Sequence, residues 1–396
     1  MLDEYIIKSL GFKLNGGIVE KSKNIKNIKA GFLLSGEHEE LPFAELKALL
    51  DVYEIDINNI DIFGNYYVLE GKFTSEIIKK IIKRGGYLNE GHLILLEYKI
   101  NDSNTENDDK WLKDFYKKVE DLEIPLSPED SFAVRVLKID KESTINSMDV
   151  ERELGRIVKD KTDSKVKLKN PLKVVRVVVL KDRIYLALIL EKRDKEYFQK
   201  NRPHLRAYFH PGCILPKLAR CLVNLSRLKK GDVLLDPFCG TGGFLIEGGF
   251  MGLKLIGSDI DDDMVNGTLL NLKSYNLTEH IISIKKWNAG DIKSFLKQLN
   301  VKYVDGIVTD PPYGISTSAK GNIEEILNNL GDVLKKDGYL VFASSRKINL
   351  DLELMEMYKL YIHKSLTRYI HVYKKTDKFM YIKRQIINHN IAIHDK

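Results

Sequence analysis

The chain has 396 residues, of which 43% are hydrophobic and 30% are charged, and its formal net charge is +7. This length predicts two or three domains, at roughly 100–200 residues each. No apolar stretch approaches the ~20 residues that cross a bilayer, and the first residues lack the apolar core of a signal peptide. We therefore expect a soluble, globular, cytoplasmic protein with no membrane association.

The chain contains only three cysteines, Cys213, Cys221 and Cys239. Their spacing matches neither a disulfide framework nor a zinc site with paired CxxC motifs. We expect reduced thiols and no metal site.

Positive charge is concentrated in residues 161–206, which hold 14 Lys or Arg and five Asp or Glu. Such a basic block next to nearly neutral sequence is typical of a protein that binds a polyanion. A solvated lysine-rich face is an equally good explanation of this block taken alone.

Two small α+β units are predicted ahead of a larger domain. Residues 1–29 have no clear role, and residues 30–100 form the first unit, with strands at 30–36 and 66–72 and helices after Pro42 and Thr74. The polar stretch 101–110 is predicted to be a linker or exposed loop at the start of the second unit, 101–192. This unit has a strand at 131–140, a helix at about 147–159 and a hairpin of two strands at 173–192.

Residues 193–396, after a linker, contain short apolar runs separated by helical patterns. The runs are DVLLDPF, KLIGSDI, IISIKKW, DGIVTD and GYLVFASS. This alternation predicts a doubly wound, mostly parallel sheet covered by helices. Ligands of such sheets bind outside the carboxyl ends of the strands, so the residues that follow each run are the candidates for function.

The first run ends in DPFCGTGGF, residues 236–244, in which Gly240 and Gly242 allow a tight turn close to a ligand. A dinucleotide-binding dehydrogenase is the main alternative, and Asp259 at the end of the second run fits a ribose diol in either case. The turn is not G-x-G-x-x-G, however, and it carries an acid at the strand tip. Asp236 would repel a pyrophosphate but attract the cationic aminoacyl end of S-adenosylmethionine.

Acids follow three successive runs, because Asp291 comes after the third. Helix N-capping, which favours Asp, is an alternative explanation for each acid taken alone. The three acids together with the glycine turn favour a cofactor pocket, in which Asp291 would bind an adenine amino group.

The fourth run ends in Asp310-Pro311-Pro312-Tyr313. The prolines stop the strand because they donate no backbone hydrogen bond. A carboxylate oxygen of Asp310 and the carbonyl of Pro311 could then accept hydrogen bonds from an exocyclic amine and aim its lone pair at a methyl donor. Tyr313 would stack on an extruded base. A plain Pro-Pro turn at a strand end is the structural alternative.

This motif resembles that of class I S-adenosylmethionine-dependent methyltransferases acting on exocyclic amines of bases. Read with RPHLRAYFHPGCILPKLAR and GSDIDDDMV, it is similar to the archaeal tRNA guanine-N2 methyltransferases that modify guanosine 10. The stretch NPLKVVRVVVLKDRIYLAL resembles a THUMP domain, and the unit before it resembles the ferredoxin-like domain that precedes THUMP. The resemblance covers roughly residues 30–380 and implies a Rossmann-like, seven-stranded methyltransferase domain.

The resemblance also implies roles for individual residues. The methionine part of the cofactor would lie among Asp236, Phe238, Gly240 and Gly242, and Asp259 would bind the ribose. Ile260 would pack on adenine beside Asp291, and His210 and Pro211 would close the pocket from upstream, although His210 is equally well explained as a structural histidine. The candidate tRNA-binding residues are Lys165, Lys167, Lys169 and Arg202.

The resulting hypothesis is a tRNA methyltransferase that makes N2-methylguanosine and N2,N2-dimethylguanosine at position 10, with S-adenosylmethionine as cofactor. The alternatives are the related enzyme for guanosine 6, whose motif usually begins with Asn, an adenine-N6 nucleic-acid methyltransferase, and a non-catalytic RNA-binding protein. The expected partner is tRNA. A small activating subunit is left open, and the chain is otherwise expected to be a monomer.

Overall fold

The computed structural model describes residues 13–15, 18–20, 27–100, 108–312, 323–363 and 366–377. The chain divides into two compact units. The first unit consists of residues 1–37, 53–83 and 88–193. The second unit consists of residues 38–52, 84–87 and 194–396.

The first unit is built on an eight-stranded sheet in the order β4-β5-β3-β6-β10-β9-β7-β8. Its strands are β3 (Ile28–Leu34), β4 (Ile57–Phe63), β5 (Tyr66–Gly71), β6 (Leu88–Lys99), β7 (Ser131–Lys138), β8 (Lys165–Val166), β9 (Lys173–Val179) and β10 (Arg183–Lys192). Only the pairs of β7 with β8 and with β9 are parallel. A separate two-stranded ladder joins β1 (Lys13–Asn15) and β2 (Ile18–Glu20).

The long strand β6 connects the two predicted α+β units. It pairs with β3 on one side and with β10 on the other, so both predicted units share one sheet. The division into 30–100 and 101–192 therefore remains a proposal about modules within that sheet. The prediction of a linker or exposed loop at 101–110 is wrong for residues 108–110, which begin the helix Asp108–Asp121, and residues 101–107 lie outside the described residues.

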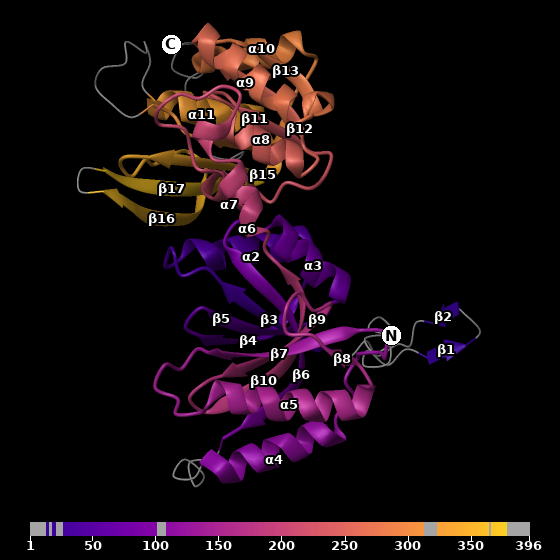
Figure 1. Cartoon of the computed structure of the whole chain (residues 1–396). Helices are drawn as coiled ribbons and strands as arrows, with labels where there is room; N and C mark the ends of the chain where they lie inside the picture. The colour runs from indigo at the N-terminus through magenta and orange to yellow at the C-terminus, as the bar shows by residue number, and fades with distance from the viewer. Residues whose placement is uncertain are drawn as a thin grey trace, which may run out of the picture. The chain divides into compact units, whose positions relative to one another are not determined.

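Helices α4 (Asp108–Asp121) and α5 (Ser147–Thr162) lie on one face of this sheet (Figure 1). Phe115 of α4 and Leu154 of α5 pack in one buried cluster with Val175 and Val177 of β9. The α5 helix begins where the Asn146 side chain accepts a hydrogen bond from the Met148 amide. Helix α3 (Ser75–Arg84) buries Ile78 and Ile82.

The second unit contains a seven-stranded sheet in the order β13-β12-β11-β14-β15-β17-β16. The strands are β11 (Val233–Asp236), β12 (Lys254–Asp259), β13 (Ile281–Lys286), β14 (Val304–Thr309), β15 (Leu334–Ser344), β16 (Glu353–His363) and β17 (Leu366–Lys374). The first five in this order are parallel, and β17 runs antiparallel to both of its neighbours. The predicted doubly wound, mostly parallel seven-stranded sheet is confirmed.

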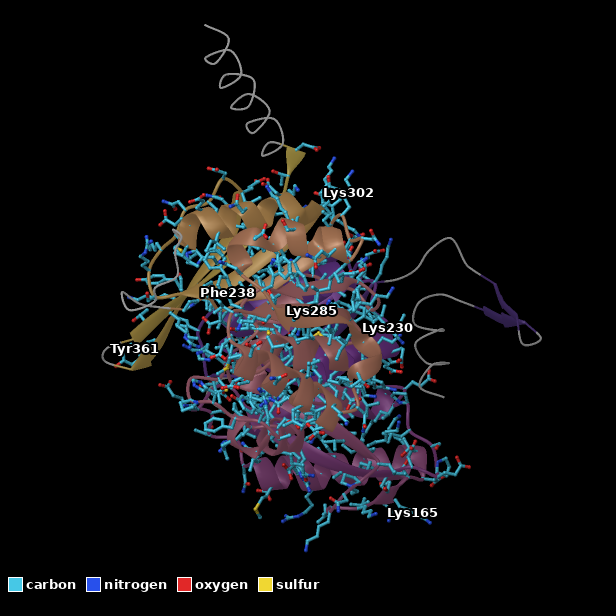
Figure 2. The ribbon with its side chains drawn as sticks, turned by 90° about the horizontal axis from the view of Figure 1, so that it is seen from above. Lys165, Lys230, Phe238, Lys285, Lys302 and Tyr361 are labelled. Atoms are coloured by element: carbon cyan, nitrogen blue, oxygen red, sulfur yellow. The ribbon has the colours of Figure 1, made fainter. Side chains whose placement is uncertain are left out.

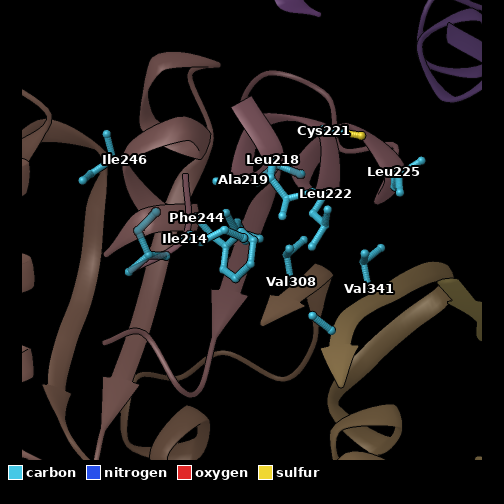
Figure 3. Packing of buried hydrophobic residues seen from close by; sticks show 14 of the residues in the cluster. Ile214, Leu218, Ala219, Cys221, Leu222, Leu225, Phe244, Ile246, Val308 and Val341 are labelled. Carbon is cyan, nitrogen blue, oxygen red and sulfur yellow. The ribbon is translucent and has the colours of Figure 1, made fainter. Parts of the chain in front are cut away.

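Helices cover both faces of this sheet. They are α2 (Leu41–Val52), α6 (Lys195–Lys200), α7 (Pro216–Leu225), α8 (Gly243–Phe250), α9 (Asp262–Ser274), α10 (Ile292–Gln298) and α11 (Ile323–Val333), with short 3-10 turns at Pro203–Leu205, Thr278–His280 and Ala289–Asp291. Figure 3 shows the core between them, in which Leu222 of α7, Phe244 of α8 and Val308 of β14 belong to one buried cluster. The strand order reverses between β11 and β14, which places a ligand site at their carboxyl ends.

Helix α2 belongs to the second unit, although the sequence pattern suggested a place in the first. Its Leu41, Ala44 and Ala48 pack in the same buried cluster as Leu218 and Leu222 of α7. The described helices include none that is long and apolar enough to cross a membrane.

A buried carboxylate holds α2 in place. Glu45 is fully buried and accepts hydrogen bonds of 2.7 Å from the amides of Gly86 and Tyr87 and from Nδ2 of Asn224 in α7. One side chain therefore connects α2, residues 84–87 and α7.

Replacing Glu45 with Ala should destabilise the second unit by about 2–5 kcal/mol, because it removes the acceptor of three buried hydrogen bonds. Denaturant unfolding of the full chain measures this change. The exposed Glu39→Ala variant serves as the control and should stay within about 0.5 kcal/mol of the wild type. Equal stability of the two variants would contradict this role of Glu45.

Candidate active site

The turn from β11 to α8 shapes one side of the site. Gly240 and Gly242 have φ angles of 51° and 83°, which only glycine adopts at little cost. The Gly240 amide donates a 2.9 Å hydrogen bond to Oδ2 of Asp259, the last residue of β12. The Asp259 carboxylate also accepts from the Asp261 amide at 3.1 Å. Asp259 therefore fixes the shape of the turn.

A cavity of about 150 Å³ opens at the carboxyl ends of β11 and β14. Its walls come from the residues before α7, from the β11–α8 turn, from α9 and from the end of β14. The lining residues are His210, Pro211, Gly212, Cys213, Ile214, Asp236, Phe238, Cys239, Gly240, Thr241, Gly243, Phe244, Met264 and Asp310. Six predicted site residues, from three separate stretches of the sequence, thus meet in one place: His210, Pro211, Asp236, Phe238, Gly240 and Asp310.

Asp236 is a buried carboxyl group with one oxygen that is not satisfied. Its Oδ1 accepts the Thr309 hydroxyl at 2.7 Å and the Phe238 amide at 3.2 Å. Its Oδ2 is buried and has no hydrogen-bond partner among the residues that the structure describes. Burial raises the pKa of Asp236 to about 8, and the nearby carboxylates of Asp259 and Asp310 add to this shift. Such an oxygen in a cavity wall fits a cationic group of a ligand.

Asp310 follows β14 directly and lines the same cavity as Asp236. Its Oδ2 is 3.5 Å from a guanidinium nitrogen of Arg368 in β17. Pro311 is buried, and the strand ends where the two prolines begin, as predicted. Tyr313 lies outside the described residues.

The residues before α7 form the upstream wall. Nδ1 of His210 lies 2.8 Å from the carbonyl oxygen of its neighbour Pro211. The Cys213 thiol donates to the His210 carbonyl at 2.6 Å and lies 3.1 Å from the Thr241 hydroxyl. These contacts join the wall to the glycine turn.

Four predicted cofactor residues do not line this cavity: Gly242, Asp259, Ile260 and Asp291. The Ile260 side chain is 65% exposed. The Asp291 carboxylate accepts the Ser294 hydroxyl at 2.6 Å. Their cofactor contacts remain predictions.

Helix capping does not account for the acids at the tips of β11 and β12. The residue that caps α8 is Gly242, and the one that caps α9 is Asp261, whose carboxylate accepts from the Asp263 amide. Asp291 occupies the cap position of α10 without a side-chain bond to the helix backbone. The capping alternative therefore explains neither Asp236 nor Asp259.

The predicted RNA-binding residues are exposed but divided between the two units. Lys165 belongs to β8, and Lys167 and Lys169 follow it in the first unit, whereas Arg202 belongs to the second. Sequence reasoning missed Thr241, Met264, Thr309 and Arg368. Thr241 lies within the glycine turn 236–244, which could have pointed to it, whereas no motif marks Met264, Thr309 or Arg368.

Two family models match the chain. A THUMP domain model matches residues 110–188, and an RMKL-like, methyltransferase domain model matches residues 203–365. The crystal structure of TrmN from Thermus thermophilus superposes with a TM-score of 0.52 at 19% identity and covers 88% of this chain and 99% of that one. This likeness supports the fold.

Curated relatives match over nearly their full length. The chain is 50% identical over 353 residues to the tRNA (guanine(10)-N2)-dimethyltransferase of Methanocaldococcus jannaschii, a match that covers 87% of this chain and 99% of the relative. It is 37% identical over 355 residues to the enzyme of the same description from Methanothermobacter thermautotrophicus, covering 87% of this chain and 98% of the relative.

The raised pKa of Asp236 predicts a pH dependence of stability without ligand. The folded state keeps the proton up to about pH 8, whereas the unfolded chain releases it near the ordinary value of 3.8. The stability that Asp236 contributes should therefore fall as pH rises from 4 to 8, by up to about 1.4 kcal/mol per pH unit.

Unfolding free energies of the wild type and Asp236→Asn, measured from pH 5 to 8.5, test this expectation. The difference, wild type minus variant, should decrease with pH, while the same difference for the exposed Asp263→Asn control stays flat. A flat difference for Asp236→Asn would contradict the pKa of about 8.

Proposed function

Because the chain belongs to the tRNA (guanine(10)-N2)-dimethyltransferase family, we propose that it transfers methyl groups from S-adenosylmethionine to N2 of guanosine 10 in tRNA. The observation that carries this proposal is the meeting of Asp236 and Asp310 on one cavity at the ends of β11 and β14. Asp236 suits the cationic end of the cofactor, and Asp310 suits the amine of the substrate.

The cavity fits the cofactor in its chemistry. The unsatisfied Oδ2 of Asp236 would accept a hydrogen bond from the ammonium group of the methionine part. His210, Pro211, Phe238 and Gly240 would enclose that part. When bound, the cofactor supplies an electrophilic methyl group.

The adenosine part of the cofactor would extend along the tips of β12 and β13. We propose that Asp259 binds the ribose, that Ile260 packs on adenine, and that Asp291 binds the adenine amino group. Gly242, whose φ angle is 83°, would lie with Gly240 beside the methionine part.

Asp310 and Pro311 would orient the substrate amine. An exocyclic amine is a poor nucleophile, because its lone pair is delocalised into the ring. Two acceptors, the Asp310 carboxylate and the Pro311 carbonyl, would favour a pyramidal nitrogen with its lone pair aimed at the methyl group. Tyr313 would stack on the extruded base.

The relatives and the motif favour guanosine 10 over the alternatives. Both full-length relatives are named for guanine 10 and for dimethylation. Asp310 at the start of the motif argues against the guanosine 6 enzyme. The THUMP match argues against a DNA adenine methyltransferase, and the cavity with both acids argues against a non-catalytic RNA-binding protein.

Lys165, Lys167, Lys169 and Arg202 would contact tRNA phosphates, which supply affinity and orientation without reading sequence. We further propose a cytoplasmic monomer. A small activating subunit is to be sought by co-purification.

Asp310→Ala should lower methyl transfer to unmodified tRNA at least about 100-fold, because the amine loses an acceptor that orients it. Labelled cofactor and nucleoside mapping measure the product, and calorimetry should show unchanged cofactor affinity. Glu279→Ala, an exposed change beside the amino end of β13, is the matched control. Loss of cofactor binding in Asp310→Ala would show that Asp310 binds the cofactor and would contradict its proposed role toward the substrate amine.

Changing Lys165, Lys167 and Lys169 together to Glu should weaken tRNA binding at least about 10-fold and reduce the slope of log affinity against log salt by about 2–3. The same change at Lys110, Lys113 and Lys117 on α4 is the control, because these exposed lysines lie in the same unit. Equal losses in the two triple variants would point to net charge and would reject the proposed contact surface.

A further inference from the structure

The hairpin of β16 and β17 reaches beyond the carboxyl edge of the second sheet. The ladder between β15 and β17 runs from Tyr339 opposite Lys374 to Ser344 opposite Tyr369, and β15 ends at Ser344. Arg368 is therefore the residue next to the Ser344–Tyr369 end of this ladder. This end lies at the carboxyl edge of the sheet, where Asp310 follows β14. Figure 2 shows Tyr361 near the far end of the same hairpin.

The side chain of Arg368 lies on the packed face of the hairpin. Arg368 stands opposite Leu360 in the ladder with β16, and Leu360 is buried. Residues opposite each other in antiparallel strands share a face. The exposed Tyr361 lies on the other face, next in sequence to Leu360.

Arg368 and Asp310 are largely shielded from solvent. A guanidinium nitrogen of Arg368 lies 3.5 Å from Oδ2 of Asp310, and the two side chains are 15% and 18% exposed. A pair shielded to this extent is screened less by water and salt than a surface ion pair. It also restricts the rotation of the carboxylate.

We propose that Arg368 is a positioning residue that holds Asp310 in its ionised, oriented form, so that Asp310 acts as a hydrogen-bond acceptor for the substrate amine. This inference rests on the proposed methyl transfer to N2. In each transfer the bond between N2 and the methyl carbon forms as the bond between sulfur and carbon breaks. The proton that N2 releases goes to solvent, because the cation next to Asp310 opposes protonation of its carboxylate.

Other titratable groups also face this carboxylate. Asp236 lies close enough for its charge to interact with that of Asp310, and Asp259 acts on Asp236 from β12. His210 and Cys213 line the same cavity from the segment before α7. Because the charges of Asp236 and Asp310 interact, an adjacent cation such as the Arg368 guanidinium favours the ionised form of Asp310.

Variants of Arg368 test the proposal through the pH dependence of kcat. Arg368→Met should lower kcat at pH 6 at least about 10-fold and should move the acid limb of the profile up by about 1–3 pH units, because the Asp310 carboxylate loses the charge of the adjacent guanidinium. Arg368→Lys should return the acid limb of the kcat profile to its wild-type position. Lys374→Met removes the ion pair with Asp337 elsewhere on β17 and serves as the control, with an unchanged profile.

A double-mutant cycle with Asp310→Asn makes the test specific. If Arg368 acts through Asp310, the Met substitution should cost much less in the Asp310→Asn background than in the wild type. Additive losses, an unmoved acid limb, or a rise confined to KM for tRNA would overturn the inference. Absence of methyl transfer by the wild-type chain would instead reject the proposed function.

Discussion

The hydrogen bond from Thr309 to Asp236 joins the two strands on which the site depends. It links the tips of β11 and β14, which are neighbours at the point where the strand order reverses. It also occupies one oxygen of Asp236, and the other oxygen is buried without a hydrogen-bond partner among the described residues. A buried carboxyl with one satisfied oxygen costs stability in the empty protein, and a cationic ligand relieves that cost.

Around this bond, each neighbouring element restricts one side of the cavity. Asp259 at the tip of β12 holds the glycine turn through the Gly240 amide. The thiol of Cys213 ties the upstream wall together and lies against Thr241. On the far side, Arg368 of β17 contacts Asp310. The result is a pocket in which two carboxyl groups have opposite surroundings: Asp236 is buried and favours its proton, and Asp310 has a guanidinium beside it.

Much of this arrangement could be predicted, because buried parallel strands appear as continuous apolar runs and their ligand-binding residues follow directly after them. Asp236 and Asp310 were found in this way. Arg368 was not, because its place at the site depends on antiparallel pairing with β15, which local sequence does not encode. The contact of helix α2 with α7 could not be predicted for a similar reason, since Glu45 reaches Asn224, which is distant in the sequence. Ile260 was placed by resemblance alone and Asp291 by its position after the third apolar run, and both lie outside the cavity lining.

The central claim is that the cavity presents an exocyclic amine of guanosine 10 to the methyl donor. It is tested most directly with two tRNA transcripts that differ only at position 10, one with guanosine and one with inosine, which lacks the N2 amine. Mass spectrometry of the nucleosides after incubation with S-adenosylmethionine should find N2-methylated guanosine in the first transcript and no methylation in the second. Equal incorporation of methyl groups into both transcripts would contradict the claim.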